Sequence, residues 1–135
     1  MRETVKQIVA EYPFLLPAGT LLLTAAVLFL TLSPADLIGG QSLGSYDKTG
    51  HVIMFGSWTY LFGLYRYVSQ PDKPSLFTIF LVGVLFGISV EVLQFLLPFE
   101  RSADLFDIAF DAIGAFIAIL VLRKSVSNEL PFSST

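Results

Sequence analysis

The residues of this sequence that could carry chemistry are ionisable side chains set inside long apolar runs. Asp104, Asp107 and Asp111 follow one another at intervals of three and four residues, the spacing of one helix face. Upstream, Glu91 and Gln94 interrupt a run that is otherwise apolar. A carboxylate inside a membrane costs at least about 2.5 kcal/mol to insert, so such residues usually face a bundle interior or a wet cavity. They are therefore candidates for a functional site.

A second group of polar residues adds positive charge. Asp47, Lys48 and His51 lie close together in the chain, and Asp47 and His51 share a face if a helix begins early. Arg101 lies in a link between two apolar runs. Lys and Arg are the usual partners of phosphate, whereas one His with several carboxylates suits a divalent cation. The residues thus leave open a polar or phosphorylated ligand, a lipid headgroup and a divalent cation.

Depth along the apolar runs predicts that these groups meet. Glu91 lies six residues before the end of its run at Leu97, and Asp111 lies six residues after the start of the next at Leu105. At 1.5 Å per residue, both lie about 9 Å inside the same boundary. We expect one ligand site with these candidates, none of them assigned as catalytic: Asp47, Lys48, His51, Glu91, Gln94, Arg101, Asp104, Asp107 and Asp111.

The elements that would position this site are four apolar runs. The chain is 54% hydrophobic and only 14% charged, against roughly 25% charged residues in an ordinary soluble domain. Runs near 18 residues or longer indicate membrane spans, and short links make consecutive spans antiparallel neighbours. We predict an all-α integral membrane protein, a single domain over residues 1–135, with four transmembrane helices in an antiparallel bundle at approximately 14–32, 51–67, 76–97 and 105–122.

Small residues continue the acidic faces of the last two runs. Gly83 and Gly87 precede Glu91 at four-residue intervals, within an arc of about 80°. Gly114 and Ala118 extend the Asp107–Asp111 face in the same way. The two faces predict a shared interior with close helix packing at the Gly83–Gly87 pair. The aromatic residues of the second run, including Trp58, are typical of an interfacial belt.

Charge sets the expected orientation and excludes one class of partner. The terminus side of a four-span layout carries six basic residues and the other side two, which predicts cytoplasmic termini. The bacterial cytoplasmic (inner) membrane is the expected location. The net charge of −3 argues against nucleic acid, and the lipid bilayer is the expected partner. The chain has no cysteine, which excludes disulfides and thiolate metal sites.

The polar residues also carry a family resemblance. Their order and spacing resemble the VanZ-like family of small membrane proteins, in three pieces: Asp47-Lys48-x-x-His51-x-x-x-Phe55, Gly87-x-x-x-Glu91-x-x-Gln94, and Arg101-x-x-Asp104-x-x-Asp107-x-x-x-Asp111-x-x-Gly114. The resemblance implies a cell-envelope role and, as an expectation, a link to teicoplanin-type glycopeptide resistance, without specifying a biochemical activity. The family commonly has Asn where this chain has Asp111, and Gly where it has Ala118.

Three functions are consistent with these residues. The leading hypothesis is an outward-facing polar site that binds a phosphorylated or polar ligand, such as a lipid headgroup or envelope precursor. The second is a membrane enzyme acting on a lipid-linked phosphate, with His51 as nucleophile or general base. The third is a structural or accessory membrane subunit whose polar residues only fix packing. The sequence decides neither whether the protein is an enzyme nor whether it needs a cofactor.

Overall fold

The described residues of the computed structural model form four helices and contain no strand. The structure describes residues 11–34, 47–69, 74–97 and 104–127. The helices are α2 (Leu15–Leu32), α3 (Asp47–Ser69), α4 (Leu76–Leu96) and α5 (Leu105–Ser127). For this part of the chain, the predicted all-helical class is confirmed.

Three of the helices are long and apolar enough to cross a membrane. They are α2, α4 and α5, which contain apolar segments of 18, 21 and 21 residues. Large apolar side chains on them point away from the protein: Leu22 is 74% exposed, Phe95 76% and Leu105 82%. A helix that is apolar all round, with such residues on its outer surface, is suited to contact with lipid.

Helix α3 differs from the predicted second span. It begins at Asp47, four residues earlier than predicted, and ends at Ser69. Polar residues such as Lys48 and Arg66 lie within these bounds, and α3 is not among the three helices with spanning character. A membrane crossing by α3 therefore stays a prediction. The early start does place Asp47 and His51 one turn apart on one helix, as the sequence suggested.

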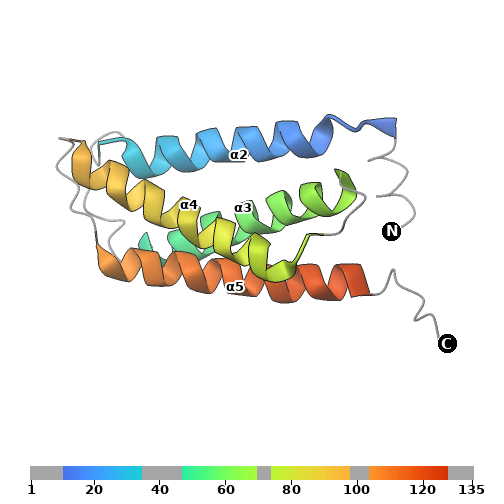
Figure 1. Ribbon diagram of the computed structural model, residues 1–135. Helices are drawn as coiled ribbons and strands as arrows, with labels where there is room; N and C mark the ends of the chain where they lie inside the picture. The colour runs from blue at the N-terminus through green and yellow to red at the C-terminus, as the bar shows by residue number, and fades with distance from the viewer. Residues whose placement is uncertain (1–10, 35–46, 70–73, 98–103, 128–135) are drawn as a thin grey trace.

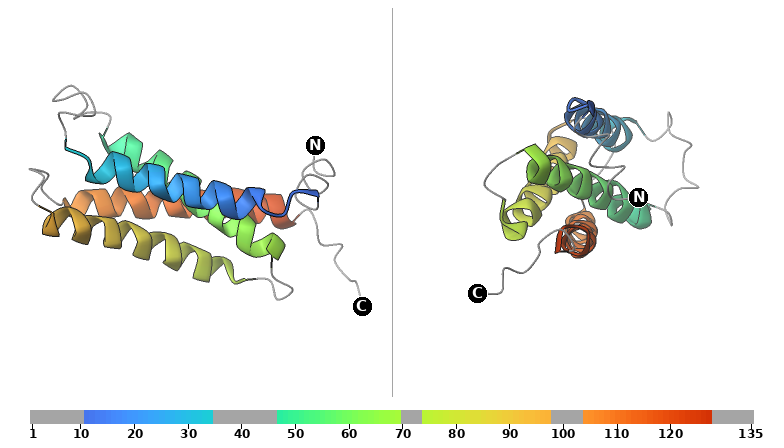
Figure 2. Two further views of the ribbon diagram at one scale, coloured as in Figure 1. Left: turned by 90° about the horizontal axis from the view of Figure 1, so that it is seen from above. Right: turned by 90° about the vertical axis from the view of Figure 1, so that its right-hand side faces the viewer.

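Helix α3 lies at the centre of the molecule and contacts each of the other three helices, α5 most extensively (Figure 2). The ends of α2 and α4 lie beside the starts of α3 and α5, at the left of Figure 1. We call this end of the molecule the site end. The start of α2 and the end of α5 lie at the opposite end (Figure 1).

Glycines allow α3 to approach α5 and α4 closely. A Cβ added to Gly56 would lie 3.0 Å from the backbone oxygen of Gly114, so the backbones of α3 and α5 touch there. A Cβ on Gly83 of α4 would overlap the hydroxyl of Thr59 on α3. A Cβ on Gly87 would lie 2.7 Å from Asp111 Oδ2. The prediction that the Gly83–Gly87 pair serves close packing is confirmed.

The aromatic residues of α3 do not all form the expected interfacial belt. Trp58 is only 7% exposed, and its ring stacks on Phe86 of α4 with centroids 4.3 Å apart. Its indole Nε1 donates a hydrogen bond of 2.8 Å to Thr24 Oγ1 on α2. The belt prediction is wrong for Trp58 because α3 is central, so this face of the helix packs between α2 and α4.

Candidate functional site

Four ionisable side chains from three helices meet near the site end. They are His51 on α3, Glu91 on α4, and Asp107 and Asp111 on α5, which are 4%, 3%, 8% and 1% exposed. We call these four residues the polar cluster. The predicted inward-facing stripes are confirmed, since the small residues Gly83, Gly87 and Gly114 on the same faces are buried too. The cost of burying carboxylates explains why they turn away from lipid and toward one another.

The closest contact in the polar cluster joins His51 and Asp111. His51 Nδ1 lies 2.8 Å from Asp111 Oδ1. An ionised carboxylate can only accept hydrogen bonds, so the imidazole that satisfies this contact carries a proton on Nδ1 and donates it. Asp111 fits there because Gly87 has no side chain. The His51 ring also stacks on Phe55, one turn further along α3, with centroids 5.7 Å apart.

The other nitrogen of His51 faces a second carboxylate. His51 Nε2 lies 3.8 Å from Asp107 Oδ2. This distance is too long for a hydrogen bond, although it allows an ion pair if the ring is protonated. Because Asp107 and Asp111 are four residues apart on α5, both face the same side of that helix, and the ring lies between them.

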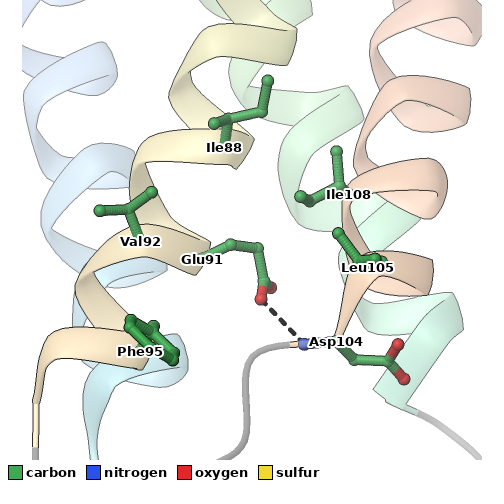
Figure 3. Close-up of a pocket in the computed structure, with 7 residues that line it drawn as sticks. All are labelled: Ile88, Glu91, Val92, Phe95, Asp104, Leu105 and Ile108. Carbon is green, nitrogen blue, oxygen red and sulfur yellow. Dashed lines mark hydrogen bonds between the residues drawn. The ribbon is translucent and has the colours of Figure 1, made fainter.

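Among the described residues, Glu91 is held through one of its two carboxylate oxygens. Its Oε2 accepts a hydrogen bond of 3.1 Å from the backbone N–H of Asp104, just before α5 begins (Figure 3). Its Oε1 is buried and has no hydrogen-bond partner among the residues that the structure describes. A buried carboxylate oxygen without a partner is energetically costly. Such an atom is expected where a bound group completes the interaction.

A small pocket between α4 and α5 leads to Glu91. Its volume is about 200 Å³. Apart from Glu91 and Asp104 its walls are apolar, and Figure 3 shows the residues that line it: Ile88, Val92, Phe95, Leu105 and Ile108. Most of these side chains belong to the outer surface of helices with spanning character. The pocket therefore adjoins the surface that would contact lipid.

Two of the predicted site residues, Gln94 and Asp104, make contacts within the fold. Gln94 Nε2 donates a hydrogen bond of 2.8 Å to the backbone oxygen of Thr31, near the end of α2, where carbonyls lack partners within the helix. Asp104 Oδ1 accepts a 2.9 Å bond from the N–H of Phe106, as an N-cap residue does. The contacts of Gln94 and Asp104 explain their positions without a ligand.

Of the two predicted basic partners Lys48 and Arg101, the structure describes Lys48, which lies outside the polar cluster. Lys48 is exposed, and its Nζ lies over the rings of Phe106 and Phe110, 5.4 and 5.6 Å from their centroids. Arg101 and the side chain of Asp47 lie outside the described residues. The described part of the candidate site is therefore three carboxylates around one imidazole, more acidic than the sequence suggested. Such a donor set can hold a cation, since His51, Glu91 and Asp107 each offer one ligand atom within 4.8 Å of the others.

Sequence reasoning missed the pocket residues and Thr59. Apolar residues in an apolar run show no distinct pattern, so nothing in the sequence marks Ile88 or Ile108 as pocket walls. Thr59 is fully buried, and its hydroxyl has no hydrogen-bond partner in the described ranges. The Gly83–Gly87 pair predicts that another helix packs closely against α4, but the spacing of the glycines does not identify Thr59 as the residue in contact.

Fold and site together define a helical membrane protein with a buried acidic cluster near one end. The profile of the VanZ/LLP1 family matches residues 19–126, which is most of the chain. The protein therefore belongs to the VanZ/LLP1 family, as the spacing of its polar residues predicted. No curated protein and no solved structure matches the chain.

Proposed function

We propose that the chain is a single-domain protein that crosses the bacterial cytoplasmic membrane four times, with α3 as the second crossing. The contacts of α3 with the three other helices support this, because a central helix must share their environment. Consecutive helices are then antiparallel, both termini are cytoplasmic and the site end faces outward. Because the natural chain lacks cysteine, single cysteines can report sidedness. A membrane-impermeant maleimide should label Gly40→Cys in intact cells and leave Ser134→Cys unlabelled; the reverse pattern contradicts the orientation.

The polar cluster is proposed to bind the phosphorylated or polar headgroup of a membrane lipid. The observation that carries this is Glu91: a buried carboxylate, with one oxygen unpartnered among the described residues, at the polar end of an apolar pocket. Interhelical hydrogen bonds in membranes average about 0.6 kcal/mol, which does not offset an insertion cost of about 2.5 kcal/mol. Packing alone therefore explains Glu91 poorly, which argues against a purely structural subunit.

The pocket supports a lipid rather than a water-soluble ligand. Its apolar walls suit an acyl or isoprenoid chain, and Glu91 lies where the headgroup of such a chain would be. Lys48, exposed beside Phe106, and Arg101 in the link between α4 and α5 are proposed to attract the phosphate.

The test uses purified protein in nanodiscs and phosphatidic acid as the probe. Phosphatidic acid should raise the melting temperature more than phosphatidylcholine does, because ligand binding to the folded state stabilises it. Glu91→Gln and His51→Ala should abolish the difference, whereas Glu11→Gln, an exposed acid before α2, should retain it. Equal shifts with the two lipids, or wild-type shifts in both site variants, contradict the proposal.

The second candidate function is an enzyme acting on a lipid-linked phosphate. It is favoured by the His51–Asp111 contact, because a carboxylate that orients an imidazole is the usual arrangement of a general base or nucleophile. Release of inorganic phosphate from phosphatidic acid by wild type and not by His51→Ala supports catalysis. Absence of release supports binding alone.

Glycopeptide resistance is a separate expectation from family membership. If the protein acts on an envelope lipid at the outer face, its expression should raise the teicoplanin concentration that a sensitive bacterium tolerates. The measurement compares wild type with Glu91→Gln at equal protein level. Equal tolerance with and without the protein contradicts the link to resistance and leaves lipid binding to be judged by the nanodisc assay.

A further inference from the structure

We infer that His51, Glu91 and Asp107 form a site for one divalent transition-metal ion, and that Asp111 positions His51 for it. One ligand atom from each of the three lies within 4.8 Å of the other two. They come from α3, α4 and α5, so the ion would join three helices at one point. The inference deepens the proposed function and rests on it for its biological use, while metal binding is measured separately.

The spacing of the His51 and Asp107 donor atoms fits shared ligation better than direct contact. His51 Nε2 and Asp107 Oδ2 are 3.8 Å apart, beyond hydrogen-bond distance. Two ligands that each lie about 2.0–2.2 Å from a tetrahedral zinc ion are about 3.3–3.6 Å from one another. A shift of a few tenths of an ångström would bring this pair to that separation.

The second carboxylate of α5 gives His51 the orientation that a metal ligand needs. With Asp111 ionised, its Oδ1 accepts a hydrogen bond from Nδ1–H across 2.8 Å, which leaves Nε2 as the nitrogen directed at Asp107. Histidines that bind metals usually donate their other N–H to a carboxylate or carbonyl, which fixes the tautomer and raises the basicity of the ligating nitrogen. Gly87 supports this arrangement, because any side chain there would displace Asp111.

Glu91 gives an independent indication that the polar cluster binds a cation. It is 3% exposed, and its Oε1 has no hydrogen-bond partner among the described residues. Its carboxylate belongs to the same group of ligand atoms as His51 and Asp107. A cation there would provide the partner that this buried oxygen lacks and offset the repulsion among the carboxylates.

The donor set selects the class of metal. One imidazole and two carboxylates suit Zn²⁺ or Mn²⁺, and a chain without cysteine has no thiolate for softer ions. Three protein ligands leave a coordination position open, as in catalytic zinc sites. A phosphate oxygen can occupy that position, which explains how an anionic headgroup would bind within an acidic cluster.

The alternative without a metal is a protonated His51 paired with both aspartates. Its two nitrogens lie 2.8 and 3.8 Å from Asp111 and Asp107, and an imidazolium would be attracted to both. This alternative leaves Glu91 Oε1 without a partner in the described part of the chain. It also predicts that the wild-type protein takes up no metal, so titration separates the two.

The experiment titrates the purified full-length chain in detergent, after EDTA treatment and dialysis, with ZnCl₂ and separately with MnCl₂ by calorimetry. We expect one equivalent of at least one of these ions to bind. Glu91→Gln and Asp107→Asn, each removing a ligand, should weaken binding at least about 10-fold, and Asp111→Ala by about 10–100-fold, the effect of losing an orienting partner. Glu11→Gln, the matched change at an exposed acid, should bind as wild type does.

Two results would overturn the inference: no binding of either ion by the wild-type chain, or wild-type affinity in Glu91→Gln. If a variant does not fold, the visible spectrum of the wild-type protein with Co²⁺ tests the site without any variant. Tetrahedral ligation of Co²⁺ by nitrogen and oxygen gives intense visible absorption, whereas the hydrated ion absorbs weakly. Phosphatidic acid binding is measured in the same samples with and without EDTA. Lipid binding without metal uptake overturns the metal site and keeps the proposed function. Metal uptake without lipid binding keeps the metal site and overturns the proposed function.

Discussion

His51 and Asp111 are 60 residues apart in the chain and 2.8 Å apart in the fold. This contact joins the second turn of α3 to the second turn of α5, so it links the two helices that pack most extensively. Its neighbours are buried, and Gly87 of α4 closes over the carboxylate. The pair therefore ties the geometry of the polar cluster to the packing of the whole site end.

The His51–Asp111 contact should appear as a coupling free energy. In a double-mutant cycle of His51→Ala and Asp111→Ala, we expect the two changes to be non-additive by about 0.5–3 kcal/mol, the range for residues in contact. The chain has one tryptophan, the buried Trp58, so its fluorescence during unfolding in SDS measures each free energy. Additive effects would contradict a direct interaction. Asp111→Asn should stay near wild-type stability, because its carbonyl oxygen still accepts from Nδ1.

Close contact between α3 and α5 should make Gly114 intolerant of a side chain. A Cβ there would overlap the backbone oxygen of Val52 and lie 3.0 Å from the backbone nitrogen of Gly56, and backbone atoms cannot move aside cheaply. We expect Gly114→Ala to lower the free energy of unfolding by about 1–3 kcal/mol, the cost of overpacking.

Gly50→Ala is the matched control for Gly114→Ala. A Cβ at Gly50 meets nothing within 4 Å, so alanine should be neutral there or stabilise α3 by up to about 1 kcal/mol. Thermal melts of the two variants under identical conditions give the comparison. Similar melting temperatures for both would show that α3 and α5 do not touch at Gly114.

Gln94 is expected to matter for stability and not for metal binding. Its amide caps the backbone oxygen of Thr31 on α2, and α2 has no residue in the polar cluster. Gln94→Leu should cost about 0.6 kcal/mol, and at most about 1.7, the values measured for interhelical hydrogen bonds in a membrane protein. Zinc titration of the same variant should give wild-type affinity; a loss comparable to that in Glu91→Gln would return Gln94 to the site.

Thr24 should stabilise the bundle through Trp58. Thr24→Val removes the acceptor of a 2.8 Å bond from a buried indole, which leaves that N–H without its partner. The same change at the exposed Thr78 of α4 is the control. We expect a loss of about 1 kcal/mol, within the range for an unpaired buried donor, in Thr24→Val only, together with a shifted Trp58 emission.

Glu91→Gln should separate a site from a scaffold. Gln keeps an oxygen that can accept from the Asp104 N–H, and it removes the insertion cost of the carboxylate, about 2.5 kcal/mol. We expect a melting temperature equal to or above that of the metal-free wild type, with binding lost. A lower melting temperature without loss of binding would favour the structural subunit.

Membrane character and the residues of the cluster could be predicted from sequence. Long apolar runs determine α2, α4 and α5, because nothing but lipid favours such uniform surfaces. The four-residue interval between Asp107 and Asp111, and the stripe that ends in Glu91, place those acids inside, because helical periodicity is local in the chain. Their burial confirms that step.

Contacts between helices could not be predicted in the same way. The sequence grouped Lys48 with the acids and Trp58 with the interface, but in the fold Lys48 lies over Phe106 and Phe110 and Trp58 is buried. The positions of Lys48 and Trp58 both follow from α3 being the central helix. The position of α3 follows from the glycines at which helix backbones can approach closely. The spacing of residues within one helix does not specify which other helix packs against it.

The sequence by itself determined which side chains must turn inward, because a charged side chain in an apolar helix is costly to expose to lipid and must face the protein interior. The tertiary structure decided how they pair: Asp111 with His51, Gln94 with the end of α2, and Glu91, among the described residues, with the backbone N–H of Asp104. Pairing depends on the rotation and offset of three helices at once, and those are set by packing between segments far apart in the chain.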